Sequence, residues 1–354
     1  MNWRHFGGLK YWGNQQFLLS PYCRTFTLRN LRSFDEERSY KAFCLIRWPY
    51  TEGKPTCVRC SHSNCWEIRR RRFKCQACRR EFSVTTGTVF AFRKMSFQDI
   101  LAGLWFSVNS VKGKSALQLS RELGCQYKTA WVLLMKMREA ISTRRLRMML
   151  EGEIHIDGKY AGGHIKPENR KEDRVDRRRA ENQNNKRLTI LALREKTPFG
   201  RGREQTLTRV IRSEDSNEAW EFVKKHVRKG SRLHADEHFS YDDLEGLQEL
   251  HRVNHSQEYQ TKGGVNTNHV ESFFSRIQRA YVGIHHRFSV RYFDWYAAEI
   301  AWREDNRRVD NGLQLWGMLH KALSRPTSRN LCGYWQGNHP HDLVWEGGVS
   351  PETA

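Results

Sequence analysis

The sequence lacks any run of about 20 apolar residues, the length that a helix needs to cross a membrane. Its first residues, 1–6, contain no apolar stretch of the signal-peptide kind. Acidic residues are also scarce, because 39 Asp and Glu stand against 61 Lys and Arg and leave a formal net charge of +22. These features predict a cytoplasmic protein that has no membrane partner and binds a polyanion, by default nucleic acid.

Cysteines number nine, which is odd, so the pattern is not that of a complete disulfide framework. Four of them form two C-x-x-C pairs separated by fourteen residues: Cys57, Cys60, Cys75 and Cys78. Two such turns that face each other supply four thiolates, so the spacing predicts a zinc ribbon in a reducing cytosol. His62 and Cys65 lie between the pairs and are alternative ligands. The basic stretch 69–74 fits a solvated hairpin and also a contact with the DNA backbone.

Apolar residues recur at helical spacing over residues 96–110, and Ser96 is suited to cap that helix. A short helix, a turn at Gly124 and a second helix to about residue 141 are expected next. This pattern is typical of a helix-turn-helix motif, whose second helix enters the major groove. The base-facing end of that helix would carry four residues: Gln126, Tyr127, Lys128 and Thr129. The core side would carry five others: Leu119, Leu123, Ala130, Leu133 and Leu134. Residues 142–150 are interpreted as a connector.

The next region has the order of elements of an RNase-H-like fold, with three strands, a helix and a fourth strand. The strands are predicted at 153–157, 188–194, 205–212 and 232–236, and the helix at 217–228. On the first strand Ile154 and Ile156 share one face, so His155 and Asp157 share the other. The charged stretch 164–186 is expected to be a long loop.

Three acidic residues carry the candidate chemistry. Asp157 ends the first predicted strand, Asp236 ends the fourth, and Glu271 opens a helix. They are separated by 78 and 34 residues. Carboxylates on two strands and one helix can hold two Mg²⁺ or Mn²⁺ ions, which cut or join phosphodiesters by stabilising the attacking and leaving oxygens. Asn268, one turn before Glu271, is a rival for the third ligand.

The helix that carries Glu271 has a clear apolar stripe, which we expect to be core: Val270, Phe273, Phe274, Ile277 and Tyr281. Gln278 lies two turns after Glu271, and both are on a face of the helix next to the apolar stripe, where they could point into a cleft. His285 and His286 follow, and we expect them to pack or to contact DNA rather than to bind a metal. The stretch beyond residue 310 contains three tryptophans but no recognisable motif.

The chain resembles the bacterial insertion-sequence transposases that join a zinc ribbon to an RNase-H-like DDE domain, in the ISXO-two-like branch. The resemblance covers about residues 50–310 and rests on motifs in a fixed order. They are 82–90 (FSVTTGTVF), 115–124 (SALQLSRELG), 127–131 (YKTAW), 157–163 (DGKYAGG), 236–241 (DEHFSY), 253–256 (VNHS), 266–274 (NTNHVESFF) and 281–286 (YVGIHH).

The resemblance implies that the metal-binding acids are Asp157, Asp236 and Glu271. Two positions depart from the family pattern. The family usually has Glu after the first aspartate, where this chain has Gly158. It also usually has Lys seven residues after the third acid, where this chain has Gln278 followed by Arg279. Either Arg279 takes over the phosphate contact of that lysine, or the basic contact is dispensable.

The expected fold class is therefore multidomain α+β. We expect a region of unclear role at 1–50, a zinc ribbon at 51–92, a helix-turn-helix domain at 93–150, an RNase-H-like DDE domain at 151–310 and a tail at 311–354. The expected function is that of a transposase that acts as a homo-oligomer on double-stranded DNA, at element ends and target, in the bacterial nucleoid. The alternatives are a non-catalytic DNA-binding regulator derived from a transposase, and a nuclease that does not join strands.

Overall fold

The computed structural model describes residues 16–145, 147–162, 168–175, 182, 187–196, 205–253, 266–286, 288–328 and 330–333. Most of the predicted loop 164–186 lies outside these residues, as do residues 1–6, most of the motif 253–256 and the last two of the three tryptophans in the tail. Within the part of the chain that is described, no helix has the length and apolar character needed to span a membrane.

The first described elements are helices α1 (Gln16–Leu19), α2 (Leu28–Arg32) and α3 (Glu36–Arg47), with 3-10 turns at Pro21–Cys23 and Pro49–Thr51. A three-stranded antiparallel sheet follows, formed by β1 (Cys65–Arg69), β2 (Arg72–Cys75) and β3 (Glu81–Phe82). The predicted hairpin over 69–74 is therefore present. One of its arginines is not solvated, because Arg71 forms ion pairs with Glu36 (2.6 Å) and Glu37 (2.9 Å) at the start of α3. These pairs attach the hairpin to α3.

Three helices come next: α4 (Phe97–Asn109), α5 (Ala116–Leu123) and α6 (Tyr127–Arg145). The hydroxyls of Ser96 and Ser115 accept hydrogen bonds from Asp99 N and Gln118 N, so both cap their helices as N-terminal serines do. Gly124 ends α5 with φ of 62°, a left-handed conformation that favours glycine. Helix α6 continues to Arg145, so the predicted connector at 142–150 begins too early.

The second sheet has five strands in the order β6-β5-β4-β7-β8. The strands are β4 (Glu153–Gly162), β5 (Arg187–Lys196), β6 (Thr206–Ile211), β7 (Arg232–Ala235) and β8 (Glu249–Arg252). β4, β5 and β6 pair antiparallel, whereas β7 runs parallel to β4 and β8 parallel to β7. The four predicted strands are present, and β8, which follows the 3-10 segment Phe239–Gly246, was not predicted.

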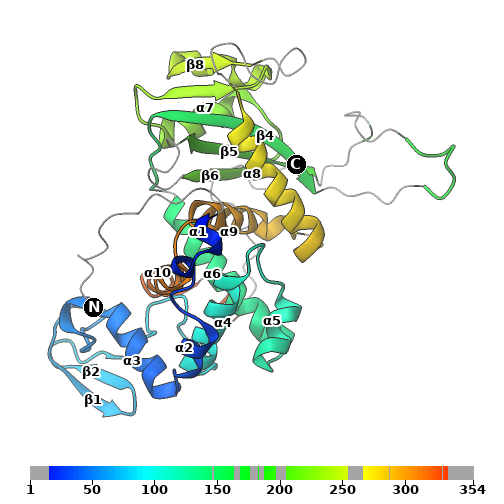
Figure 1. Cartoon of the computed structure of the whole chain (residues 1–354). Coiled ribbons are helices and arrows are strands. Elements are labelled where there is room, and N and C mark those ends of the chain that lie inside the picture. The colour runs from blue at the N-terminus through cyan, green and yellow to red at the C-terminus, as the bar shows by residue number, and fades with distance from the viewer. Residues whose placement is uncertain are drawn as a thin grey trace.

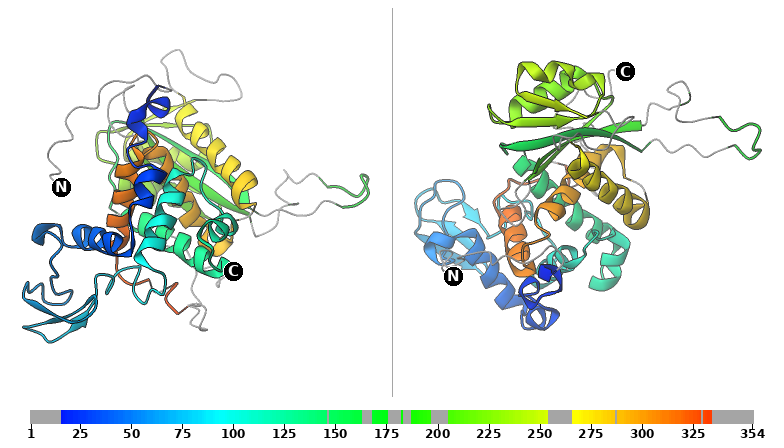
Figure 2. Two further views of the ribbon diagram at one scale, coloured as in Figure 1. Left: turned by 60° about the horizontal axis from the view of Figure 1, so that its bottom comes forward. Right: turned by 45° about the horizontal axis from the view of Figure 1, so that its top comes forward.

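Helices cover both faces of this sheet (Figures 1 and 2). Helix α7 (Ser216–His226) packs on the face that carries Ile154 and Ile156. Helices α8 (Asn268–Ala280) and α9 (Phe293–Asp305) pack on the other face, with a π-helical turn at Tyr281–His285 and a 3-10 turn at Val290–Tyr292 between them. The alternation of side chains along a strand therefore directs His155 and Asp157 toward the α8 side, as predicted.

Helix α9 connects the sheet to the helices before it. Its residues Ala298 and Trp302 belong to the apolar core shared by α3, the small sheet, α4, α5, α6 and α10 (Asn311–Leu323). Its buried Glu299 accepts a hydrogen bond from the equally buried Arg138 of α6 at 2.6 Å. Arg303 donates to the carbonyls of Ser107 (3.1 Å) and Ser110 (2.9 Å) at the end of α4. Residues before 51 and after 310 thus pack on the same core as the helices between them.

Candidate functional site

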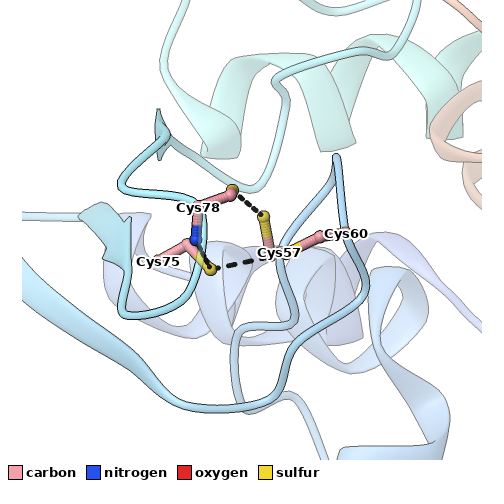
Figure 3. Close-up of side chains that lie close together, drawn as sticks. All are labelled: Cys57, Cys60, Cys75 and Cys78. Carbon is pink, nitrogen blue, oxygen red and sulfur yellow. Dashed lines mark hydrogen bonds between the residues drawn. The ribbon is translucent and has the colours of Figure 1, made fainter.

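Two turns of the small sheet bring four cysteines together (Figure 3). The sulfurs of Cys57 and Cys78 are 3.5 Å apart, and those of Cys60 and Cys75 are 3.6 Å apart. All four sulfurs lie within 4.8 Å of one another. Four thiolates at about 2.3 Å around one zinc ion have sulfurs about 3.8 Å apart, so this group could hold Zn²⁺ with little rearrangement.

The backbone of the two turns favours the thiolate form of Cys57 and Cys75. In Cys60 the N–H of His62 acts in the same direction, but burial and the three neighbouring thiols outweigh it and raise the pKa to about 12. Arg59 N lies 3.4 Å from the sulfur of Cys57, and Cys78 N lies 3.5 Å from the sulfur of Cys75. Burial alone would raise the pKa of Cys57, but the N–H groups of Cys60 and Arg59 outweigh it and lower the pKa to about 6. The N–H of Cys78 likewise lowers the pKa of Cys75. Thiolates are the metal-binding form, so the local backbone prepares the cluster for a cation.

The alternative ligands between the two pairs are not part of the cluster among the described residues. Cys65 starts β1 and its sulfur donates to the carbonyl of His62 at 3.7 Å. Burial raises the pKa of the Cys65 thiol to about 11. The geometry therefore agrees with the four-cysteine set.

The two aspartates come together through the parallel pairing of β4 and β7. His155 pairs with His234, and continuing that register by two residues places Asp157 beside Asp236, directly after β7 ends. The prediction that Asp157 ends its strand is wrong, because β4 runs on to Gly162 in its pairing with the long strand β5. Asp157 therefore lies in the middle of a strand, where ladder hydrogen bonds on the β5 side hold its backbone.

Strand β8 supports the loop that carries Asp236. Arg252, the last residue of β8, donates to the carbonyls of Asp236 and His238, both at 2.9 Å. Arg252 also forms an ion pair with Asp242. The Asp236 carboxylate in turn accepts a hydrogen bond from His238 N at 3.0 Å. The unpredicted fifth strand thus fixes the backbone around the second acid.

Glu271 lies in the first turn of α8 and is exposed, and its charge adds to those that raise the pKa of Asp157. The buried Arg194 of β5 donates to the carbonyl of His269 at 3.2 Å, which fixes the start of the helix on the sheet. The hydroxyl of the buried Thr267 donates to the Glu271 carboxylate at 2.7 Å. Asn268 is exposed, and its N–H donates to the side chain of Asn266 at 3.1 Å. The carboxylate of Glu271 is therefore held by the protein at the entrance to α8.

The acids influence one another through their charges, although their carboxylate oxygens do not form a group within 4.8 Å among the described residues. The pKa of Asp157 is raised to about 8, first by burial, then by the carboxylates of Asp236 and Glu214, and also by Glu271. Burial and nearby negative charges both disfavour the ionised form of a carboxyl group. A cation bound among these groups would relieve the repulsion, so the arrangement has the electrostatic character of a metal site.

Sequence reasoning missed Glu214, a fourth acid whose charge contributes to the raised pKa of Asp157. It lies between β6 and α7, and burial raises its pKa. The hydroxyl of the fully buried Tyr241 donates to it. A Cβ at Gly158 would collide with the Glu214 carboxylate, so this carboxylate takes the space beside the strand that a side chain at 158 would need. The unusual glycine after Asp157 was the signal in the sequence, although it did not identify the acid.

The predicted DNA-contacting residues lie at the start of α6 and near the end of α8. Gln126, Tyr127 and Lys128 are exposed, and Thr129 is half-buried. Arg279 is exposed as well, as is its neighbour Gln278. The expected core residues of α5 and α6 are buried, apart from the partly buried Leu123. Polar and basic side chains are thus available at the N-terminus of α6.

The two histidines after α8 have different settings. The ring of His285 packs against Tyr296 (4.9 Å) and Phe288 (5.5 Å), and burial lowers its pKa to about 4. His286 has a left-handed backbone at φ of 55°. Neither belongs to a metal-ligand group within the described part of the chain. The packing interpretation of His285 is therefore confirmed.

Comparison with known proteins gives one match. Residues 149–305, which contain β4 to β8, α8, α9 and all four acids, match the family model of the ISXO2-like transposase domain. No curated protein and no solved structure matches the chain.

Proposed function

We propose that this chain, whose residues 149–305 form an ISXO2-like transposase domain, is a DNA transposase that cleaves strands at the ends of a mobile element and joins them to a target. The observation that carries the proposal is the electrostatic coupling of Asp157 to Asp236 and Glu271. Burial, followed by the charges of Asp236, Glu214 and Glu271, raises the pKa of Asp157 to about 8. The strand order β6-β5-β4-β7-β8, with α7 before β7, supports an RNase-H-like catalytic fold.

In this proposal Asp157, Asp236 and Glu271 hold Mg²⁺ or Mn²⁺. When bound, such ions acidify water and stabilise the oxygens that attack and leave phosphorus. The carboxylate of Glu271 suits a hard divalent cation better than the amide of Asn268 does. The hydrogen bond from Tyr241 and the space at Gly158 hold Glu214 near the site, where its charge raises the pKa of Asp157. Glu214 is thus a positioning residue that acts through Asp157.

DNA recognition is assigned to the regions on either side of the catalytic acids. Helices α5 and α6, joined by the turn at Gly124, support a helix-turn-helix whose exposed residues Gln126 to Lys128 read bases. Arg279 and the overall charge of +22 supply contacts with phosphates. The ribbon around the four cysteines completes the element-end binding region. We also propose that the protein works as a homo-oligomer, so that two DNA ends can be held together.

The decisive experiment compares cleavage, joining and binding in the same preparations. Asp157→Asn and Asp236→Asn should lower Mg²⁺-dependent cleavage of end-containing DNA by more than about 100-fold. That is the upper range for losing a residue that only orients a metal ligand. Binding of the end DNA should stay within a few-fold, because neither residue lies in the helix-turn-helix. Cleavage at the wild-type rate in either variant would refute the metal assignment.

Two further outcomes separate the alternatives. A wild-type protein that binds ends but cuts no DNA with Mg²⁺ or Mn²⁺ would be a regulator derived from a transposase. A protein that cuts but never joins a pre-cut 3′-hydroxyl end to target DNA would be a nuclease.

A further inference from the structure

A row of histidines crosses the sheet two residues before the aspartates. The strand register pairs His155 of β4 with His234 of β7, and His234 with His251 of β8. Their rings stack, with centroids 5.0 Å apart for the first pair and 5.4 Å for the second. The ring of His269, in the first turn of α8, meets His155 edge-on at 5.2 Å. The row therefore lies on the α8 side of the sheet, the same side as Asp157.

Two of these imidazoles have ring nitrogens without a hydrogen-bond partner in the described part of the chain. His155 is fully buried, and neither of its ring nitrogens has a partner among the described residues. His234 is 6% exposed, and its Nδ1 is also without one. His251 differs, because its Nε2 lies 2.8 Å from a carboxylate oxygen of Glu249. Buried polar atoms in native proteins are nearly always paired, so the orphaned nitrogens of His155 and His234 point to a missing ligand.

A carboxylate completes the group. Glu153 precedes His155 by two residues and so lies on the same face of β4. Its Oε1 is 3.3 Å from Nε2 of His234. One ligand atom from each of Glu153, His155 and His234 lies within 4.8 Å of the other two. The Glu153 side chain is 33% exposed, which gives an ion a path to the two buried rings.

The basic side chains around Glu153, His155 and His234 do not occupy all of the proposed ligand atoms. Lys196 of β5 donates to Oε1 of Glu153, so Oε2 is the oxygen available to an ion. Arg194, next to His155 in the row, is directed at the carbonyl of His269 and at Glu304. Arg232, next to Glu153 on β7, is paired with Glu249. Arg194 and Arg232 therefore have partners outside the proposed ligand set, and Lys196 engages only one of the two Glu153 oxygens.

We propose that Glu153, His155 and His234 form a binding site for a borderline divalent metal ion such as Zn²⁺, separate from both the cysteine cluster and the aspartates. Two imidazoles and one carboxylate, with a position left open, are a common ligand set for zinc and suit it better than magnesium. An ion there joins β4 to β7 just before Asp157 and Asp236 and holds the spacing of the two strands. The inference does not depend on the transposase proposal, because it concerns metal content alone.

Metal analysis of the full-length chain tests the site. Protein purified with zinc and then equilibrated in excess Mg²⁺, which keeps zinc off the aspartates and Glu271, should retain two zinc ions per chain. His155→Ala, His234→Ala and Glu153→Gln should each retain one. Cys75→Ser should also retain one, and a variant that combines it with His155→Ala should retain none. His251→Ala is the matched control from the same row and should retain two.

Cobalt substitution shows which site is lost. Thiolate ligands give Co²⁺ an intense charge-transfer band, whereas imidazole and carboxylate ligands give only weak visible bands. The second equivalent of Co²⁺ should add visible bands without charge transfer, and Glu153→Gln should remove only these. Circular dichroism checks that the variants are folded, and Glu153→Gln changes a partly exposed residue. One zinc per chain in the wild type, or two in Glu153→Gln and His155→Ala alike, would overturn the site.

Discussion

The cysteine cluster and the carboxylate cluster are both candidate metal sites, but they are assembled in different ways. The four cysteines come from two short turns, and N–H groups inside those turns lower the pKa values of Cys57 and Cys75. The acids come from β4, the loop after β7 and the start of α8, and burial together with the neighbouring negative charges raises the pKa of Asp157. The first site is prepared for a cation by local backbone, whereas the second needs the whole domain to hold like charges together.

This difference predicts how each site fails. A site built by local turns should lose its metal and the conformation of those turns together, because metal binding and local folding are coupled. A site built on a five-stranded sheet with apolar layers on both faces should lose activity and keep its fold. The following predictions test that contrast, from the largest expected effect to the smallest.

The largest effect is expected from Cys75→Ser. The ribbon should lose its zinc and unfold locally, because a structural zinc site contributes roughly 10 kcal/mol or more to a small domain. Metal content and proteolysis between residues 51 and 92 measure the two losses. Cys65→Ser is the matched control, since its sulfur is outside the cluster, and should leave both unchanged. Loss of zinc in the Cys65 variant would show that the ligand set is wrong.

Glu271→Gln should reduce Mg²⁺-dependent nicking by more than about 100-fold with little change in melting temperature, because it removes a charged ligand and no apolar contact. Asn268→Ala, one turn earlier and exposed, is the paired variant and should keep nicking within a few-fold. Nicking assays and thermal melts of both variants decide the matter. The reverse pattern would move the third ligand to Asn268 and leave Glu271 as a charge at the helix N-terminus.

The pH dependence of the carboxylate site follows from the raised pKa of Asp157. Metal binding needs the ionised carboxylate, so at low Mg²⁺ activity should fall about tenfold per unit as pH drops below about 8. Glu214→Gln removes one of the charges that raise this pKa and should move the fall to lower pH. If the midpoint of the activity–pH profile is the same in Glu214→Gln as in the wild type, Glu214 does not act through Asp157.

The raised pKa of Asp157 also predicts how the stability of the metal-free protein depends on pH. The pKa of Asp157 is about 8 in the folded protein against an ordinary 3.8, so the folded state keeps a proton that the unfolded chain has lost. Its contribution to stability is therefore complete below about pH 4 and is lost as pH rises to about 8. In EDTA, Asp157→Asn should raise the melting temperature more at pH 8 than at pH 5. An equal change at both pH values would contradict the shift.

The smallest effect is expected in DNA recognition. Lys128→Ala should weaken binding to element ends by about 1–3 kcal/mol if the side chain reads a base, and should weaken binding to unrelated DNA much less. Binding isotherms at several salt concentrations measure both. Equal weakening on both DNAs, with a shallower salt dependence, would make Lys128 a phosphate contact instead.

Much of the fold could be predicted because its signals are local. Ser96 and Ser115 cap their helices and Gly124 adopts the left-handed turn, and each effect depends only on neighbouring residues. Strand β8 gave no comparable signal, because its four residues have no apolar alternation and are held by pairing with β7. The end of β4 was misplaced for a related reason, since its length is set by the partner strand β5.

By itself the sequence determined the four thiolates, the three acids and the order of the elements that carry them, because spacing and periodicity within short segments specify these. Only the tertiary structure decided what surrounds them. Glu214 lies beside Asp157 because Gly158 leaves space for it, and Arg71 is paired with α3 rather than with solvent. The rings of His155 and His234, three of whose nitrogens have no partner among the described residues, meet through the register of two strands far apart in the chain. Contacts of this kind depend on packing between distant segments, which no local pattern encodes.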